Sequence, residues 1–145
     1  MRGVLGCDHV ALTVADLEAS AVFYEGLGFA PERRVSFDGP GAERVTGVPG
    51  ASLRMAFLVL GEFRLELIQF APPGEQKISA LNDLGSAHIC LRVNDIERVY
   101  SELSARGSQF NSPPYHHPSG VSMTYFGDPD GNILELLEVN GSDAS

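Results

Sequence analysis

The most constraining feature of this 145-residue chain is a segment that occurs twice. Residues 9–18 align without gaps on residues 88–97, 79 positions further along, and both copies open with a histidine. In each copy apolar residues alternate with other residues, as in a half-buried strand, and an aspartate then precedes a helical pattern. The sequence therefore predicts one structural unit that is present twice.

Each repeated strand is expected to lead into a helix. Asp16 and Asp95 stand at the N-cap positions, where an aspartate side chain can accept hydrogen bonds from the free amides of the first turn. Gly26 or Gly28 is expected to end the first helix and Gly107 the second. The apolar stripes at helical spacing consist of Leu17, Ala21 and Tyr24 in the first copy and of Ile96, Val99, Tyr100 and Leu103 in the second.

A second pair of matching segments closes the two copies. Residues 64–69 match residues 133–138, and each segment carries a glutamate, Glu66 or Glu135, between apolar neighbours. These segments are 69 positions apart, so the first copy holds ten extra residues, which we place in the Gly/Pro-rich stretch 38–50. The remaining strands are expected at residues 33–37, 53–60, 109–111 and 121–126, with turns at 61–62 and 128–132.

This order of elements predicts an α+β fold made of two βαβββ modules. We expect one domain over residues 1–145. Its first module covers residues 7–70, a linker covers residues 71–85 with the Pro/Gly-rich part at 71–76, and the second module covers residues 86–139. Residues 140–145 are expected to form a polar tail.

Four polar residues recur at matched places in the two copies: His9, Glu66, His88 and Glu135. Because side chains alternate along a strand, all four are expected on the faces opposite to the apolar residues. Taken singly, each is commonly a hydrogen-bonded or solvated strand residue, but a fourfold recurrence favours one metal site between halves related by a pseudo-twofold axis.

The chemistry of these four side chains limits the metal. Imidazole nitrogen and carboxylate oxygen together suit one divalent ion of Ni, Co, Zn, Mn or Fe, and the lack of thiolates argues against a structural zinc. Four protein ligands leave two positions of an octahedral ion open. A substrate with two neighbouring oxygens could occupy both.

Composition excludes several classes of partner. The net charge of −9 and the pI of about 4.7 repel phosphate backbones, so we expect no nucleic acid and no anionic membrane as partner. No apolar run approaches the roughly 18 residues of a membrane span, and the first residues are too short for a signal peptide, so we expect a cytoplasmic protein. Cys7 and Cys90 are expected to be free thiols.

Further residues are candidates for contact with a small-molecule substrate. Arginines around the stretch 38–50 could bind a carboxylate or phosphate, although solvated surface charge is the common alternative. The proline-rich loop 113–120 could gate a pocket or supply an acid or base, or it could be an exposed loop without a catalytic role. The candidates are Arg33, Arg54, Tyr115, His116, His117 and Tyr125.

Three motifs carry a resemblance to a known family. DHVALTV at residues 8–14, FYEGLGF at residues 23–29 and YFGDPDGNILEL at residues 125–136 closely resemble the glyoxalase/bleomycin-resistance/extradiol-dioxygenase superfamily. The resemblance covers residues 7–138. It implies that the two modules form a curved mixed sheet around a metal-binding cavity, and that the protein is a homodimer.

The His, Glu, His, Glu set is similar to that of glyoxalase I, whose metal binds the enediolate of a hemithioacetal while a liganding glutamate shuttles a proton. Mapped onto this chain, His9 and His88 would hold the metal, and Glu66 or Glu135 would be both ligand and catalytic base. The resemblance therefore implies a metal-dependent lyase or isomerase that acts on a small substrate with vicinal oxygens.

Two alternatives stay open. Fe(II) extradiol ring-cleaving dioxygenases typically use two histidines and one glutamate, which would match His9, His88 and Glu135 and would leave Glu66 a spectator. A metal-free protein that sequesters a drug, as bleomycin-resistance proteins do, is the other alternative. Two buried carboxylates argue against it, because each is costly to desolvate without a partner.

Overall fold

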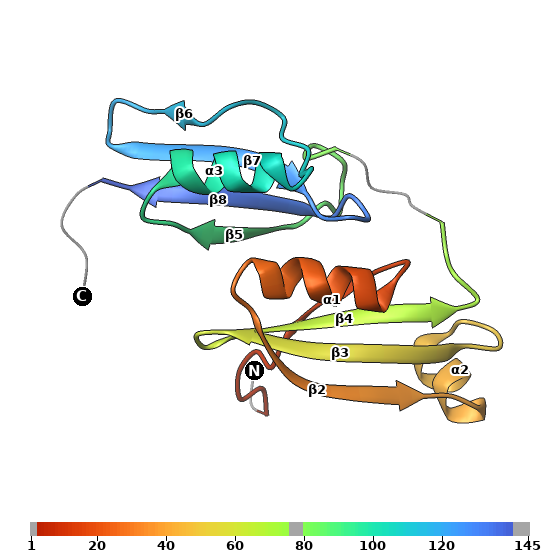
Figure 1. Ribbon diagram of the computed structural model, residues 1–145. Helices are drawn as coiled ribbons and strands as arrows, with labels where there is room; N and C mark the ends of the chain where they lie inside the picture. The colour runs from red at the N-terminus through yellow and green to blue at the C-terminus, as the bar shows by residue number, and fades with distance from the viewer. Residues whose placement is uncertain (1–2, 76–79, 141–145) are drawn as a thin grey trace. The chain divides into compact units, whose positions relative to one another are not determined.

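The computed structural model describes residues 3–75 and 80–140, and the chain divides into two compact units, residues 1–75 and residues 76–145 (Figure 1). Unit 1 contains β1 (Val10–Thr13), α1 (Leu17–Gly26), β2 (Ala30–Phe37), α2 (Pro40–Thr46), β3 (Ser52–Leu60) and β4 (Phe63–Ala71). Unit 2 contains β5 (His88–Arg92), α3 (Ile96–Ala105), β6 (Tyr115–His116), β7 (Val121–Gly127) and β8 (Ile133–Val139).

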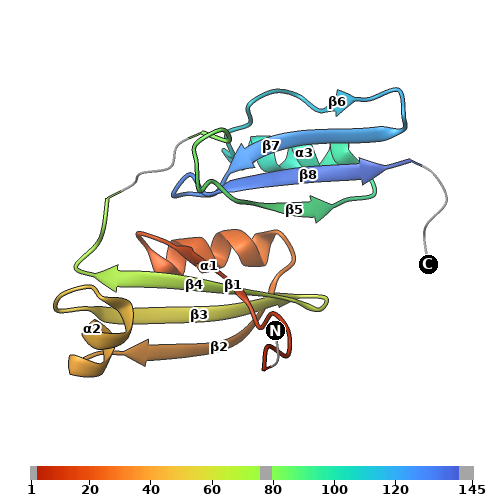
Figure 2. The same cartoon turned by 180° about the vertical axis from the view of Figure 1, so that it is seen from behind.

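Each unit holds one four-stranded mixed sheet with the same topology. The strand order is β1-β4-β3-β2 in unit 1 and β5-β8-β7-β6 in unit 2. The first strand of each unit pairs in parallel with the last one, and the other pairs are antiparallel (Figure 2). The predicted α+β fold of two βαβββ modules is confirmed. That the two modules form one domain stays a prediction.

The predicted N-caps are present in both long helices. Asp16 Oδ1 accepts hydrogen bonds from the backbone amides of Glu18 and Ala19, each 3.0 Å long, and Asp95 Oδ1 accepts one from Arg98 at 3.0 Å. The predicted glycines end both helices, because Gly28 follows the C-cap Leu27 of α1 and Gly107 follows the C-cap Arg106 of α3, each with a positive φ. The first turns are thus fixed by residues close in sequence.

A second bond ties each helix to the last strand of its own sheet. The amide of Leu17 donates to Gln69 Oε1 at 3.2 Å in unit 1, and the amide of Ile96 donates to Glu138 Oε2 at 2.7 Å in unit 2. Gln69 and Glu138 are the matched ends of the repeated closing segments. Each helix start is therefore fixed by its own sheet.

Replacing Asp16 with alanine is expected to lower the free energy of unfolding by about 1 kcal/mol, because two first-turn amides lose their acceptor. Asp16→Asn, which keeps a capping oxygen, should cost much less. Urea unfolding followed by circular dichroism measures both. Equal losses in the two variants would mean that the charge of Asp16, and not its cap, stabilises α1.

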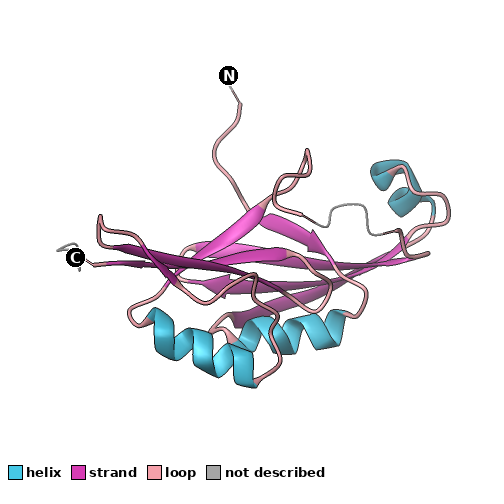
Figure 3. Cartoon of the chain, turned by 90° about the horizontal axis from the view of Figure 1, so that it is seen from above, coloured by secondary structure: helices cyan, strands magenta, loops and turns pink. Residues whose placement is uncertain are grey.

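The apolar core of each unit lies between its sheet and its long helix, which covers one sheet face (Figure 3). In unit 1, Leu17, Tyr24, Leu65 and Leu67 are buried completely or almost so. In unit 2 the buried set is Ile96, Leu103, Leu134 and Leu136, and the predicted stripe residues Val99 and Tyr100 are half-buried. The face opposite the long helix is left for other side chains.

One expected strand is absent, and the expected stretch 38–50 contains a helix that was not predicted. The extra residues of unit 1 form helix α2, which begins at a proline in its first turn and whose buried Ala42 packs with Ala51 and Leu53. In unit 2, residues 109–111 do not form a strand, because only Phe110 bridges to Phe126 and prolines without N–H groups follow. Strand β6 lies instead at Tyr115–His116.

Part of the predicted linker and tail cannot be compared with the structure. Residues 76–79 of the linker and residues 141–145 of the tail lie outside the described residues. Within the described part, residues 72–75 and 80–87 contain neither helix nor strand, as expected of a connection. In the part of the chain that the structure describes, no helix has the length and apolar character that crossing a membrane requires.

Candidate functional site

The first His–Glu pair lies on the sheet face of unit 1 that α1 does not cover. Ala11 of β1 is beside Glu66 of β4, and His9 immediately precedes β1. This register brings His9 Nε2 to 3.0 Å from Glu66 Oε2. The Glu66 residue is only 7% exposed, and it points away from Leu65 and Leu67, which face α1.

Unit 2 repeats this arrangement at matched positions. Cys90 of β5 is beside Glu135 of β8, and His88 Nε2 lies 3.1 Å from Glu135 Oε2. Glu135 is 8% exposed. In both units the histidine is thus two residues before the strand position that pairs with the glutamate. The sequence repeat has produced two equivalent pairs of an imidazole and a buried carboxylate.

An aromatic ring completes each pair. Phe57 of β3 is directly opposite Glu66, and Tyr125 of β7 is directly opposite Glu135. The His9 and Phe57 rings meet edge to face with centroids 5.6 Å apart, and the His88 and Tyr125 rings do so at 5.4 Å. Sequence reasoning named Tyr125 but missed Phe57. The signal that could have found Phe57 is its place opposite Glu66 across the 61–62 turn.

The imidazole of His9 lies between two carboxylates. Asp8 Oδ2 lies 2.9 Å from His9 Nδ1, so both ring nitrogens face carboxylate oxygens. Ionised carboxylates only accept hydrogen bonds, and a neutral imidazole can donate from one nitrogen only. When Nδ1 donates to Asp8, Nε2 of His9 and the carboxylate of Glu66 are therefore two acceptors facing each other. A proton or a metal ion between them would bridge the two. These donors fit a divalent ion.

Neighbouring groups respond to the charges of the two pairs. The hydrogen bond from His9, assisted by Arg64, holds the pKa of Asp8 below its usual value. Burial, together with the negative charge of Glu135, raises the pKa of the Cys90 thiol to about 11 and raises that of Tyr125 as well. Cys90 and Tyr125 thus keep their protons at neutral pH and can donate them in hydrogen bonds to Glu135.

No complete metal site is present among residues 3–75 and 80–140, because no three or more of their His, Cys, Asp or Glu side chains form a group that could hold an ion. Each unit provides one imidazole nitrogen and one carboxylate that could bind a metal.

The two arginine candidates lie on different faces of the unit 1 sheet. The Arg33 guanidinium lies 4.2 Å from the centre of the Phe57 ring, on the face that carries Glu66. Arg54 pairs with Glu18 of α1 at 2.9 Å, as does Arg34, and so belongs to the helix-covered face. Only Arg33 shares a face with the first His–Glu pair.

The loop candidates also separate. Tyr115 is 57% exposed and pairs with Met123, which shares a strand face with Tyr125. His116 lies on the other face, where Nδ1 is 2.8 Å from Ser122 Oγ and Nε2 is 2.8 Å from Glu97 Oε1 of α3. These contacts tie β6 to α3.

His117 makes a local contact only, with Nδ1 2.7 Å from the hydroxyl oxygen of Ser119. This bond stays within the turn after β6. Among the described residues, the His117 side chain contacts Ser119 and the Tyr115 ring, and it therefore shapes the loop.

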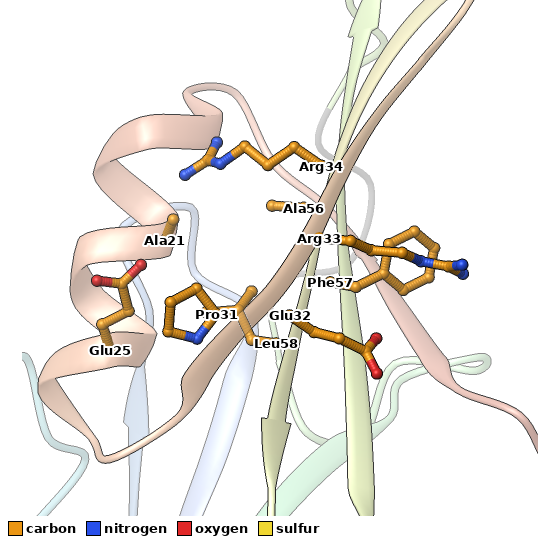
Figure 4. A pocket seen from close by; sticks show the side chains of 9 residues that line it. All are labelled: Ala21, Glu25, Pro31, Glu32, Arg33, Arg34, Ala56, Phe57 and Leu58. Carbon is orange, nitrogen blue, oxygen red and sulfur yellow. The ribbon is translucent and has the colours of Figure 1, made fainter.

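A hollow of about 200 Å³ lies at the edge strand β2 of unit 1 (Figure 4). Ala21, Glu25 and Pro31 line its helix side, and Arg33 with Phe57 project on the other side of the strands. Neither His9 nor Glu66 is among the residues that line it. The hollow thus lies between α1 and β2, and it shares Phe57 with the surroundings of His9.

Comparison with known proteins identifies relatives over most of the chain. The sequence profile of the Glyoxalase/Bleomycin resistance protein/Dioxygenase superfamily matches residues 6–136. A solved structure of a glyoxalase family protein from Bacillus cereus superposes with a TM-score of 0.86 at 26% identity, covering 97% of this chain and 99% of that one.

Two curated relatives carry functional names. A bleomycin resistance protein of Klebsiella pneumoniae is 30% identical over 131 residues, which is 85% of this chain and 84% of that protein. A 2-epi-5-epi-valiolone epimerase of an Actinomyces species is 28% identical over 148 aligned positions, which cover 94% of this chain and 81% of the epimerase. One name describes resistance to a drug and the other describes catalysis.

Proposed function

Because the chain belongs to the glyoxalase/bleomycin resistance protein/dioxygenase superfamily, we propose that it is a metal-dependent lyase or isomerase of the glyoxalase I type. The observation that carries this proposal is the pair of buried carboxylates, Glu66 and Glu135, at 3.0 and 3.1 Å from the two imidazoles. A buried carboxylate is costly unless a cation or several donors compensate it. Two of them at matched positions are best explained by a shared ion.

The proposed ligands are His9, Glu66, His88 and Glu135, around one divalent ion of Ni, Co, Zn, Mn or Fe. The bound ion supplies a Lewis acid that stabilises negative charge on a substrate oxygen. Both His–Glu pairs have to reach the same ion, as pairs of one chain or of two copies in a homodimer. The substrate is a small molecule with two neighbouring oxygens.

Glu66 or Glu135 is the proposed base. The carboxylate takes a proton from the substrate carbon next to the carbonyl and returns it to the adjacent position, so no proton is gained or lost overall. The 2-epi-5-epi-valiolone epimerase among the relatives supports chemistry of the isomerase class. Tyr125 can donate a hydrogen bond beside Glu135, and Arg33 can bind an anionic group of the substrate.

The deciding experiment combines metal analysis with two assays. Protein purified without added metal is analysed for bound metal and is then assayed with methylglyoxal plus a thiol, and separately with a catechol under oxygen. About one ion per site and turnover of the hemithioacetal or a related substrate are expected. Turnover of the catechol with bound iron would support the ring-cleaving alternative instead.

Replacing the base by its amide separates its two roles. If Glu66 is the base, Glu66→Gln is expected to lower kcat by about 10²- to 10⁴-fold, because the amide cannot accept the proton. Glu135→Gln is the matched test of the other carboxylate, and Glu62→Gln, in the exposed turn before β4, is the charge control. Full activity of Glu66→Gln would reject Glu66 as the base, and full activity of Glu66→Ala would reject the four-ligand site and leave the set His9, His88 and Glu135.

A second candidate function is a metal-free protein that sequesters a drug. The 30% identity to a bleomycin resistance protein favours it. In this case the His–Glu pairs would be imidazolium–carboxylate pairs. Calorimetry with bleomycin distinguishes the two functions, since tight binding by metal-free protein without any turnover would support the sequestering protein.

A further inference from the structure

A chain of hydrogen bonds in unit 1 leads from the protein surface to His9. Glu32 Oε1 accepts from Arg64 Nη2 at 2.8 Å, and Arg64 Nη1 donates to Asp8 Oδ1 at 3.0 Å. The second oxygen of Asp8 lies 2.9 Å from His9 Nδ1, and His9 Nε2 lies 3.0 Å from Glu66 Oε2. Every link joins described residues of the same unit.

This series of hydrogen bonds restricts the imidazole of His9. A neutral imidazole carries its proton on one nitrogen, and the carboxylate of Asp8 can only accept. Donation from Nδ1 to Asp8 competes with donation from Nε2 to Glu66, and the form that donates to Asp8 leaves Nε2 as the free donor atom, directed at Glu66. A hydrogen bond from the second ring nitrogen to a carboxylate also fixes the ring plane of a metal-bound histidine.

Asp8 alone would hold His9 weakly. Its side chain is 67% exposed, and an exposed pair contributes little because water competes and side-chain entropy is lost. Arg64 changes this, because its side chain is only 32% exposed and its guanidinium contacts Asp8 and Glu32 at the same time. Because the planar guanidinium of Arg64 is bonded to Glu32 as well as to Asp8, it limits the freedom of the Asp8 carboxylate.

The second copy of the repeat lacks this support. Ala87 stands at the position of Asp8, and Ile133 stands at the position of Arg64. Neither side chain can accept or donate a hydrogen bond. His88 keeps its contacts with Glu135 and with the edge of the Tyr125 ring. The two matched histidines thus differ in what fixes their tautomer.

We propose that Asp8, held by Arg64, is a positioning residue that presets His9 as an Nε2 ligand, and that His88 is not preset in this way. The inference rests on the proposed function for the role of His9 as a ligand. The preset tautomer itself is a property of the metal-free protein. The pair of His9 and Glu66 is therefore better organised than the pair of His88 and Glu135 before any ion binds.

Nitrogen-15 NMR of the imidazoles tests the tautomer without metal. In metal-free protein at alkaline pH, where imidazoles are neutral, His9 is expected to carry its proton on Nδ1. In Asp8→Ala the His9 signals should shift towards the form protonated at Nε2, which donates to Glu66, while those of His88 stay unchanged. An Nε2-protonated His9 in the wild type, or an unchanged tautomer in Asp8→Ala, would overturn the proposal.

Metal affinity provides the second readout. Asp8→Ala should weaken Zn(II) binding, measured by calorimetry, by about 10- to 100-fold, the usual effect of removing a partner of a liganding histidine. Asp8→Asn retains an acceptor oxygen and should recover part of the loss. Asp38→Asn is the control, because it follows β2 at the opposite edge of the sheet from β1.

The two readouts separate this inference from the proposed function. Unchanged Zn(II) affinity in Asp8→Ala, with the wild type binding Zn(II), would overturn the positioning role. Lack of Zn(II) binding by the wild type would reject the metal-dependent function, and the positioning role towards a metal with it, while the NMR result would still decide the tautomer. Thermal unfolding of Asp8→Ala checks that the exposed substitution leaves the fold intact.

Discussion

Replacing His9 with alanine is expected to weaken the binding of a divalent metal by at least about 100-fold. Loss of an outer partner of a ligand already costs about 10- to 100-fold, so loss of the ligand itself should cost more. His88→Ala should have an effect of the same size, because the two histidines occupy equivalent places beside Glu66 and Glu135. Calorimetry with Co(II) or Zn(II) on metal-free protein measures both.

A matched histidine controls for the loss of an imidazole. His117→Ala removes a side chain that contacts only Ser119 and the Tyr115 ring among the described residues, and it should leave metal affinity unchanged. If only one of His9→Ala and His88→Ala weakens binding, the two pairs do not share an ion. If neither does, the proposed site is rejected.

Truncating the core beneath α1 should have the largest effect on stability. Leu67 is completely buried on β4, and Leu67→Ala is expected to lower the free energy of unfolding by about 2–5 kcal/mol, because transfer energy is lost and a cavity remains. Leu136 is the matched residue of β8 and is equally buried, so Leu136→Ala should cost a similar amount. Denaturant unfolding of both variants provides the measurement.

The control for this experiment is an exposed apolar residue of the same unit. Val22 of α1 is 70% exposed, and Val22→Ala should change the free energy of unfolding by no more than about 0.5 kcal/mol. A loss below about 1 kcal/mol in Leu67→Ala would contradict a tightly packed interface between β4 and α1. Unequal losses in Leu67→Ala and Leu136→Ala would show that the two units differ in stability.

The duplicated fold could be predicted because its signals are local. Alternation along residues 9–14 and 88–93 gives strands, and Asp16 and Asp95 give helix starts within three residues. The repeat then matches the two copies without any knowledge of contacts. Helix α2 was missed because Gly39 at its start has no side chain that could cap the helix. A strand was wrongly predicted at residues 109–111 because the effect of the prolines that follow was not taken into account.

The pairing of each histidine with the glutamate of its own half depends on register. Alternation predicted that His9 and Glu66 lie on an uncovered face, but only the parallel pairing of β1 with β4 sets the distance of 3.0 Å between them. The same pairing brings Arg64 to Asp8, 56 residues away in sequence. The sequence contained these residues without indicating their contact.

The sequence by itself thus determined the duplicated βαβββ order, the helix starts and the four matched donors, because hydrophobic period and capping act over a few neighbouring residues. The tertiary structure decided which face each remaining polar residue occupies. Arg54 and His116 belong to helix-covered faces, and Arg33 lies beside Phe57. Strand register and the packing of helices on sheets fix these neighbours, and both depend on residues far apart in the chain.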